Sequence, residues 1–374
     1  MIKGAYVHIP FCEHICYYCD FNKVFIQKQP VDDYLNALEK EITNQPRSCE
    51  IETIFIGGGT PTALNTEQFE KLMVMIKDHL YHNGITEYTV EANPENLDNA
   101  KLRLMKNYGV TRLSLGVQTF QNDLLTEIGR PHTNRDVIHV MQEARHYGFD
   151  NISIDLMFGL PNQTEDMLRA SINEALRLDP EHISIYSLQI EPKTIFYNRM
   201  KKGKLVLPGQ DIEAQMYELI INELAANGLI HYEISNFAKK GHESRHNLHY
   251  WNNDEYFGFG AGAHGYINDK RVVNAGPIKS YIREVNKKGH ARTATHEVTR
   301  TEKIEEEMFL GLRKLSGVSK RAFYTKYHQT IDDIYSRELA DLKERGLLTE
   351  DEKRVALTKQ GVFLGNTVFE SFIK

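Results

Sequence analysis

Three of the four cysteines lie within eight residues near the N-terminus. Cys12, Cys16 and Cys19 have the spacing C-x3-C-x2-C, and the fourth, Cys49, follows thirty residues later. Thiols this close together can ligate a cubane iron-sulfur cluster, and three thiolates leave one iron with an open coordination site. That open site can bind a further ligand. Cys49 has no partner in the sequence and is interpreted as a small buried hydrophobic residue.

A structural zinc ion is the alternative ligand of the same three cysteines. Zinc is often held by three cysteines and one histidine, and His8 or His14 could be the fourth ligand. Structural zinc sites usually draw their ligands as close pairs from separated segments, and the chain has no second C-x2-C pair. The spacing therefore favours the cluster and leaves zinc open.

Composition limits the partners and the compartment. The chain has 374 residues with 51 acidic and 45 basic side chains, a formal charge of -6, and no long basic block that would follow a phosphate backbone. Nucleic acid is not an expected partner. The sequence has neither an apolar run of about 18 residues nor a signal peptide. We therefore expect a cytoplasmic protein, whose thiols are free for metal or redox chemistry.

Strand and helix patterns alternate along the first 230 residues. Six such β/α units in succession predict parallel strands with right-handed crossovers, and thus a partial (β/α)6 barrel of the α/β class. The predicted strands are 5–9, 52–56, 88–92, 112–118, 151–157 and 182–188. The predicted helices are 31–44, 67–80, 99–107, 134–146, 165–177 and 211–226.

One face of these predicted strands is apolar and the other is polar. A closed eight-stranded barrel fills its interior with branched apolar side chains, so a polar lining predicts an open barrel with a wet cavity that binds something sizeable. The polar positions are Tyr6, His8, Thr89, Glu91, Ser114, Gly116, Gln118, Ser153, Asp155, Ser184 and Tyr186.

The chemically useful members of this polar face come late in their strands. Glu91, Gln118 and Asp155 each sit near a strand's end, and the cysteine loop follows the first strand. Parallel α/β folds place their sites at this C-terminal rim. Glu91 and Asp155 could instead only cap neighbouring helices. The gathering of several such residues on one rim favours a site.

The cysteine loop resembles the signature of the radical S-adenosylmethionine superfamily. The segment Phe55 to Thr62, FIGGGTPT, resembles that family's methionine-binding loop, in which glycines let the backbone approach a ligand closely. The resemblance implies a [4Fe-4S] cluster whose open iron is chelated by the amino and carboxylate groups of S-adenosylmethionine.

Further motifs resemble the coproporphyrinogen dehydrogenase (HemN-like) subfamily. They are YVHIPFC, GGGTPT, EANP, LGVQTF, Gly129-Arg130, DLMFGLP and GAGAHG, and they run from Tyr6 to Gly265. The resemblance implies contacts with S-adenosylmethionine from Tyr6, Tyr18, Gly58, Gly59, Thr60, Glu91, Gln118, Arg130 and Asp155.

Two features distinguish branches of this subfamily. The dehydrogenases resemble C-x3-C-x2-C-x-C and carry an N-terminal extension, whereas here Phe21 takes the place of the fourth cysteine and the extension is absent. The segment from His246 to Trp251, HNLHYW, resembles the H-N-x-x-Y-W motif of the haem-chaperone branch, HemW. That resemblance implies haem binding at His246, with His249 as the competitor, and delivery of haem to an acceptor, such as a respiratory protein.

Two alternatives remain open. An oxygen-independent coproporphyrinogen III dehydrogenase would abstract hydrogen from propionate side chains with a 5'-deoxyadenosyl radical and release carbon dioxide. The other alternative is a non-enzymatic iron-sulfur or zinc module.

The chain divides into three predicted parts: a barrel over 1–230, a sheet extension carrying the HNxxYW segment over 231–295, and a winged-helix-like domain over 296–374. Acidic runs in the last part would repel DNA, so partner contact or packing is expected there. Phe363, Val368, Phe369 and Phe372 favour core packing over at most peripheral membrane contact. The predicted elements are helices 301–314, 319–326, 331–345 and 359–372 and strands 346–350 and 354–357.

Overall fold

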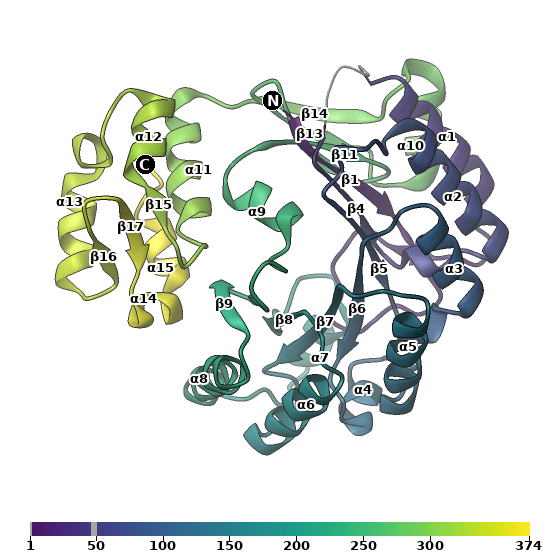
Figure 1. Ribbon diagram of the computed structural model, residues 1–374, viewed down its shortest axis with the longest axis horizontal. Coiled ribbons are helices and arrows are strands. Elements are labelled where there is room, and N and C mark those ends of the chain that lie inside the picture. Colours follow the sequence, from purple (N-terminus) through teal and green to yellow (C-terminus); the bar gives the residue numbers. More distant parts are fainter. Residues whose placement is uncertain (1, 46–50) are drawn as a thin grey trace.

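The computed structural model describes residues 2–45 and 51–374, so Cys49 lies outside the described residues. A twelve-stranded sheet organises the chain up to residue 297 (Figure 1). Its six central strands pair in parallel in the chain order that the sequence predicts. They are β1 (Ile2–Ile9), β4 (Thr53–Gly58), β5 (Glu87–Ala92), β6 (Arg112–Gln118), β7 (Ile152–Phe158) and β8 (His182–Ser187).

Shorter strands extend both edges of this parallel array. β11 (Glu255–Phe259) pairs in parallel with β1, and an antiparallel ribbon continues beyond it. The sheet order runs from β14 to β9 without closing, which gives the partial barrel of the prediction. The remaining strands are β12 (His264–Ile267), β13 (Lys270–Asn274), β14 (Arg292–Glu297), β10 (Asn236–Ala238), β9 (Ile230–Glu233), and the pair β2 (Phe11–Cys12) and β3 (Val24–Phe25) in the cysteine loop.

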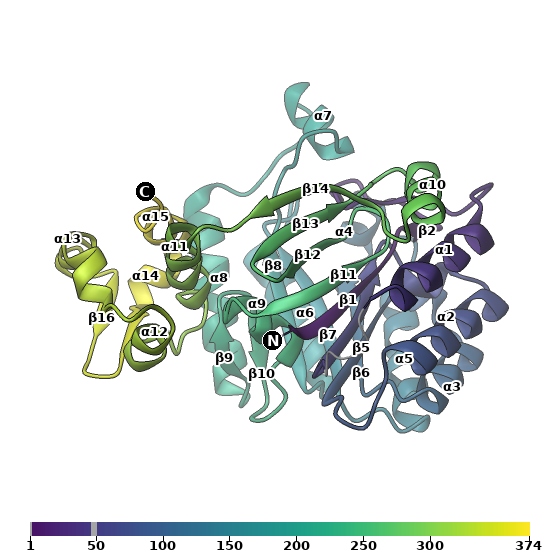
Figure 2. The ribbon, with the colours of Figure 1, turned by 90° about the horizontal axis from the view of Figure 1, so that it is seen from above.

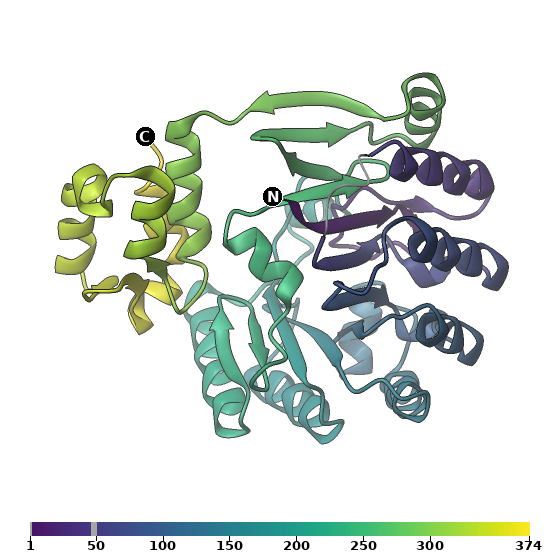
Figure 3. The same ribbon diagram turned by 45° about the horizontal axis from the view of Figure 1, so that its top comes forward.

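Helices cover the convex face of the sheet (Figure 3). The branched residues that the sequence assigns to this face, such as Val7, Ile154 and Ile183, have no exposed surface. Thr164 caps α6 through its side chain. The layer consists of α1 (Val31–Thr43), α2 (Thr66–His79), α3 (Asn99–Asn107), α5 (Asn134–His146), α6 (Glu165–Arg177) and α8 (Gln210–Ala226). The other helical elements of this part of the chain are η1 (Pro61–Ala63), η2 (Pro94–Asn96), α4 (Asn122–Glu127), α7 (Ile195–Lys201), α9 (Arg245–Trp251) and α10 (Ile278–Lys288).

The two short helices α7 and α9 leave this layer. α7 projects away from the barrel (Figure 2), yet Phe196 at its start is fully buried and its backbone N–H donates to Tyr17 of the cysteine loop. α9 lies on the concave side of the sheet, between the central strands and the C-terminal part (Figure 1). It contacts β1, β4 and β11.

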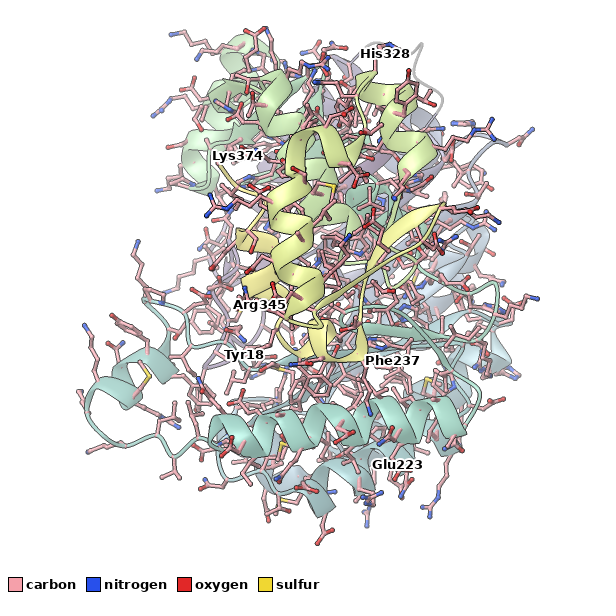
Figure 4. All side chains as sticks on the ribbon, turned by 90° about the vertical axis from the view of Figure 1, so that its left-hand side faces the viewer. Tyr18, Glu223, Phe237, His328, Arg345 and Lys374 are labelled. Atoms are coloured by element: carbon pink, nitrogen blue, oxygen red, sulfur yellow. The ribbon has the colours of Figure 1, made fainter. Side chains whose placement is uncertain are left out.

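The C-terminal part of the chain has a hydrophobic cluster of its own, which includes Met308, Phe323, Leu339 and Val355. We call residues 298–374 the C-terminal unit; Figure 4 views it from the front, with α8 running below it. It contains α11 (Arg300–Gly311), α12 (Lys320–Tyr327), α13 (Ile331–Glu344) and a three-stranded sheet of β15 (Val318–Ser319), β17 (Arg354–Leu357) and β16 (Leu348–Glu350).

The prediction of a single last helix over 359–372 is wrong. The structure has α14 (Lys359–Phe363) and α15 (Gly365–Glu370), separated at Leu364, whose backbone is not helical. The break directs Val368 and Phe372 into the core, where neither has exposed surface. These two side chains are therefore unavailable to a membrane. None of the helices in the described ranges combines the length and apolar character needed to cross a bilayer.

Candidate functional site

A cavity of about 460 Å³ opens at the C-terminal ends of the parallel strands. All the residues predicted to bind the cluster, S-adenosylmethionine or haem line it, so the structure brings together residues that lie up to 240 positions apart in the chain. These residues are Cys12, Cys16, Cys19, Tyr6, Tyr18, Gly58, Gly59, Thr60, Glu91, Gln118, Arg130, Asp155 and His246.

The cysteine loop occupies one end of this cavity, which we call the cluster end. Cys12 is buried, and Cys16 and Cys19 are half-buried. Thr60 lies 3.7 Å from the Cys12 sulfur through its hydroxyl oxygen, a weak hydrogen bond. Burial raises the pKa of the Cys12 thiol to about 11, so iron would have to displace its proton on binding.

The rest of the loop is tied to the barrel by its backbone and by Asn22. The backbone N–H of Tyr17 donates to Ile128 at 3.0 Å. The Asn22 amide donates to the carbonyl oxygens of Ala261 at 2.8 Å and Gly276 at 3.0 Å, which joins the loop to the GAGAHG segment. The loop is therefore held in place by contacts that do not involve its thiols.

His8 bonds the protein through both ring nitrogens, one of them to a backbone carbonyl, which argues against its role as a fourth zinc ligand. Its Nδ1 bonds the Tyr6 hydroxyl at 2.9 Å and its Nε2 bonds the Asn22 carbonyl at 2.7 Å. His14 lines the cavity and is exposed, and Phe21 is 63% exposed at the cavity wall. Across residues 2–45 and 51–374, no three His, Cys, Asp or Glu side chains converge on a single-ion site. The three thiols of the loop fit a cubane with one open iron.

The glycine turn after β4 runs directly against the cluster end. Gly58 has φ +119°, and a Cβ there would come within 2.6 Å of the His8 ring. A Cβ on Gly59 would lie 2.9 Å from the Cys12 sulfur. Only glycine allows this approach of backbone to loop. The N–H groups of Gly58 and Gly59 are bonded to Glu91 at 3.1 Å and to the Ile9 carbonyl at 2.9 Å, so a ligand beside the thiols would meet the carbonyl oxygens of the turn.

Two carboxylates face the middle of the cavity. Glu91 accepts the Gly58 backbone N–H at 3.1 Å, and burial, together with the charge of Asp155, raises its pKa to about 7. Asp155 accepts from the hydroxyls of Ser114 at 3.0 Å and Ser153 at 3.1 Å, and burial raises its pKa as well. Asp155 does not cap the helix that follows it, so its position is explained by the cavity.

Arg130 reaches the cavity from the turn after α4. Its guanidinium donates to the Asn93 side-chain oxygen at 2.7 Å and to the Tyr18 hydroxyl at 3.3 Å. Its Nε is buried and has no hydrogen-bond partner within the described part of the chain. A buried guanidinium N–H left unpaired beside a cavity fits an anionic ligand group such as a carboxylate.

Gln118 enters the cavity through a distortion of the sheet. It has φ +67°, and the β6 to β7 register shifts between Gly116 and Gln118. Backbone strain and bulges of this kind redirect side chains at functional sites. The alternation of the sequence predicts the face of Gln118 but not the bulge.

Sequence reasoning missed several residues of the cavity. Arg112 is 2% exposed, lines the cavity, and carries a buried Nε that lacks a partner among the described residues. It has the same strand parity as Ser114 and Gly116, so the alternation already contained the signal. Asn93 of the EANP motif also lines the cavity, where its side-chain oxygen accepts from Arg130.

α9 forms the opposite end of the cavity, which we call the α9 end. Glu87 holds the start of this helix by accepting the backbone N–H groups of Arg245 at 2.8 Å and His246 at 3.0 Å. His246 is 1% exposed. Its Nδ1 bonds the Thr53 hydroxyl at 2.8 Å and its Nε2 bonds the Tyr250 hydroxyl at 2.8 Å. Burial lowers its pKa to about 3, so the ring is neutral.

The competitor, His249, is not among the residues that line the cavity. Its Nδ1 lies 3.1 Å from Asp254, and its Nε2 lies 3.9 Å from Glu52 at the start of β4. The two histidines of the HNxxYW segment therefore have different surroundings, and only His246 reaches the cavity.

The C-terminal end of α9 touches the C-terminal unit. The Arg313 guanidinium lies 4.4 Å from the centre of the Trp251 ring. Lys326 donates to the Asn252 carbonyl at 3.1 Å. A helix of seven residues thus contacts both the cavity and the C-terminal unit.

Comparison with known proteins identifies relatives along the whole chain. Residues 6–175 match the model of the radical SAM superfamily, and residues 298–364 match the HemN C-terminal domain. "Heme chaperone HemW" of Bacillus subtilis is 57% identical and covers 100% of this chain and 99% of its own length. The protein of the same name from Escherichia coli is 32% identical, with 99% and 98% covered.

The crystallised coproporphyrinogen III oxidase HemN of Escherichia coli, a radical SAM enzyme, has the same fold. It superposes with a TM-score of 0.87 at 26% identity and covers 99% of this chain and 90% of its own. Membership of the superfamily implies a [4Fe-4S] cluster and S-adenosylmethionine. On sequence identity over its full length, this chain belongs to the HemW family of the radical SAM superfamily.

Proposed function

We propose that the protein is a haem chaperone that binds haem at His246 and passes it to an acceptor protein. In this proposal Cys12, Cys16 and Cys19 hold a [4Fe-4S] cluster and the same cavity holds S-adenosylmethionine. The names of the relatives support the haem function, and the thiols and polar side chains lining the cavity support the cofactors.

The proposed roles in binding S-adenosylmethionine follow from the chemistry of each group. Arg130 pairs with the methionine carboxylate through its free Nε, and Glu91 and Asp155 accept from the ribose hydroxyls. When bound, the cluster supplies one electron to a sulfonium that can be cleaved reductively. The remaining proposed contacts are the peptide groups of Gly58 and Gly59, the Thr60 hydroxyl, and the side chains of Tyr6, Tyr18 and Gln118.

The observation that carries the haem proposal is the position of His246. It is the one histidine of the HNxxYW segment that lines the cavity, and its burial keeps the imidazole neutral, which is the form that ligates iron. Thr53 bonds its Nδ1, an arrangement that orients a metal-binding histidine.

A haem titration tests this proposal. Ferric haem added to the protein should give a saturable Soret shift. His246→Ala should weaken binding by about tenfold or more, while the matched control His249→Ala should stay within about twofold of the wild type. An unchanged titration of His246→Ala would remove that residue from the site.

Coproporphyrinogen III dehydrogenase is the second candidate, and the fold shared with the HemN oxidase favours it. Phe21 argues against it, because a phenyl ring cannot replace the fourth thiol. Anaerobic incubation of the reconstituted protein with coproporphyrinogen III should give no protoporphyrinogen. Robust product would overturn the chaperone assignment. Metal analysis that returned zinc without iron or sulfide would instead support a zinc module.

The proposed setting is the cytoplasm, with at most peripheral membrane contact and no nucleic-acid partner. The acceptor is expected to be a haem protein, for example a respiratory one. Crosslinking of the haem-loaded protein in extracts of a respiring culture, compared with His246→Ala, should enrich haem-accepting proteins only for the wild type. Equal enrichment by both proteins would contradict haem-dependent docking.

A further inference from the structure

The imidazole of His246 is enclosed on every side but one. Phe55 stacks on its face with ring centres 5.2 Å apart, and the Thr53 hydroxyl bonds Nδ1 at 2.8 Å. The ring also lies so close to the backbone of Gly4 that a Cβ there would be 3.2 Å from its Nδ1 and Cε1 atoms. These contacts restrict rotation of the ring and place Nδ1 against Thr53, so Nε2 is the nitrogen that remains for an iron atom.

Tyr250 occupies that remaining side. Its hydroxyl lies 2.8 Å from Nε2 of His246, and its ring meets the imidazole edge-on with centres 5.0 Å apart. The spacing of four residues places both side chains on one face of α9. An iron atom binding Nε2 needs the lone pair of that nitrogen, so the hydrogen bond with Tyr250 must be broken whichever of the two atoms donates it.

A second cavity gives the Tyr250 ring a place to move. This cavity has a volume of about 290 Å³ and is lined by Tyr250 itself, Trp251, Tyr256 and Phe309, among others. Tyr250 lines both cavities and therefore lies between them. The Tyr256 ring already contacts it edge-on at 4.6 Å between centres.

We infer that Tyr250 is a latch on His246: its hydroxyl competes with haem iron for Nε2, and haem ligation requires the Tyr250 side chain to swing out toward Trp251 and Tyr256. This inference rests on the proposed haem function of His246. Tyr250 acts through His246 and is therefore a positioning residue. The latch keeps the buried imidazole hydrogen-bonded while no haem is present, which avoids an unpaired polar atom in the protein interior.

Ferric haem titrations of the wild type and four variants test the latch. Tyr250→Phe keeps the ring and removes the hydroxyl, and it should tighten haem binding by about 3- to 10-fold, the equivalent of one neutral hydrogen bond. Tyr256→Phe is the matched control and should change binding by less than about twofold. In the background of His246→Ala, the Tyr250→Phe change should have no effect, because its partner is gone.

The electron paramagnetic resonance spectrum of the ferric haem complex gives a second measurement. The spectrum should be the same in wild type and Tyr250→Phe, and it should change in His246→Ala. Wild-type or weaker affinity in Tyr250→Phe, or an equal gain in the His246→Ala background, would overturn the latch while leaving the haem function intact. If none of the proteins binds haem, the haem function and the latch both fail.

Discussion

At the cluster end of the cavity the donor atoms carry few bonds, whereas at the α9 end the imidazole is bonded at both nitrogens. The only side-chain contact described for Cys12 is the weak one from Thr60, and the loop is held by Asn22 and backbone groups. His246 has two hydrogen bonds of 2.8 Å. Under the proposed function, the cluster end would receive its ligand directly, and the α9 end would first give up the bond between His246 and Tyr250.

This difference matches the duties proposed for the two ligands. A cluster that stays with the protein does not need a competing bond that would ease its release. A ligand that is delivered to an acceptor must also leave, and a competing hydrogen bond within the protein lowers the free-energy cost of its release. In the proposed function, the cavity therefore combines a permanent cluster site and an exchangeable haem site.

The largest effect is expected from removing a thiol at the cluster end. Cys16→Ala should reduce bound iron and sulfide after anaerobic reconstitution to the background level, since two thiolates cannot hold the cubane. Its haem titration should stay within about twofold of the wild type if the two ends act separately. Cys49→Ala is the control and should keep its full iron content. A cluster retained in Cys16→Ala would refute the assignment of the loop.

A glycine substitution tests how closely the glycine turn packs against its neighbours at the cluster end. Gly58→Ala places a Cβ 2.6 Å from the His8 ring at φ +119°, and it should lower the free energy of unfolding by about 3 to 5 kcal/mol. Gly203→Ala also has a positive φ, +63°, but its Cβ would meet nothing within 4 Å. Gly203→Ala should lower the free energy of unfolding by about 1 kcal/mol. Urea denaturation measures both, and equal losses would show that the contact with His8 is unimportant.

The pH dependence of stability tests the carboxylate between the two ends. Glu91 has a pKa of about 7 in the folded protein and 4.5 as its ordinary value, so the folded state keeps a proton that the unfolded state loses. This group's contribution to stability should therefore fall by roughly 3 kcal/mol as the pH rises from about 4.5 to about 7. Denaturation of the ligand-free protein at several pH values should show a shallower decline for Glu91→Gln. The same slope in both proteins would contradict the burial of this carboxylate.

The smallest effect is expected at the start of α9. Glu87→Gln keeps the shape of the side chain but weakens its acceptance of two backbone N–H groups, and it should cost about 1 to 2 kcal/mol of stability. Haem affinity should fall by a few fold, because the helix carries His246. Glu243→Gln, two residues before Arg245, serves as the control. Loss of bound iron in Glu87→Gln would show that the two ends are not separate.

The sequence predicts the parallel barrel well because its signals are local. Helices 134–146 and 165–177 have the predicted bounds, since Thr133 and Thr164 mark where each begins. The period of two in the strands placed Glu91 and Asp155 in the cavity. The prediction of one last helix fails at Leu364, which is followed by Gly365, and glycine weakens a helix interior, so a local signal for the break was present.

The sequence predicts a site residue where a family motif contains it or where the polar face of a strand includes it. It does not predict the hydrogen bonds of His246 to Thr53 and Tyr250, because these depend on how α9 packs against β4. The spacing of His246 and Tyr250 would have placed them on one helix face, yet it does not reveal which histidine of the segment enters the cavity. That choice depends on the surroundings of His249, which are built from β4 and from the turn after α9.

The contacts between α9 and the C-terminal unit have a consequence for delivery. Trp251 and Asn252 follow Tyr250 in the chain, and Arg313 and Lys326 of the C-terminal unit contact them. An outward swing of Tyr250 would therefore alter these contacts. An acceptor protein that binds the C-terminal unit would therefore have different affinities for the haem-loaded and the haem-free protein. By thermodynamic reciprocity, binding of the acceptor would change the affinity of this protein for haem by the same factor.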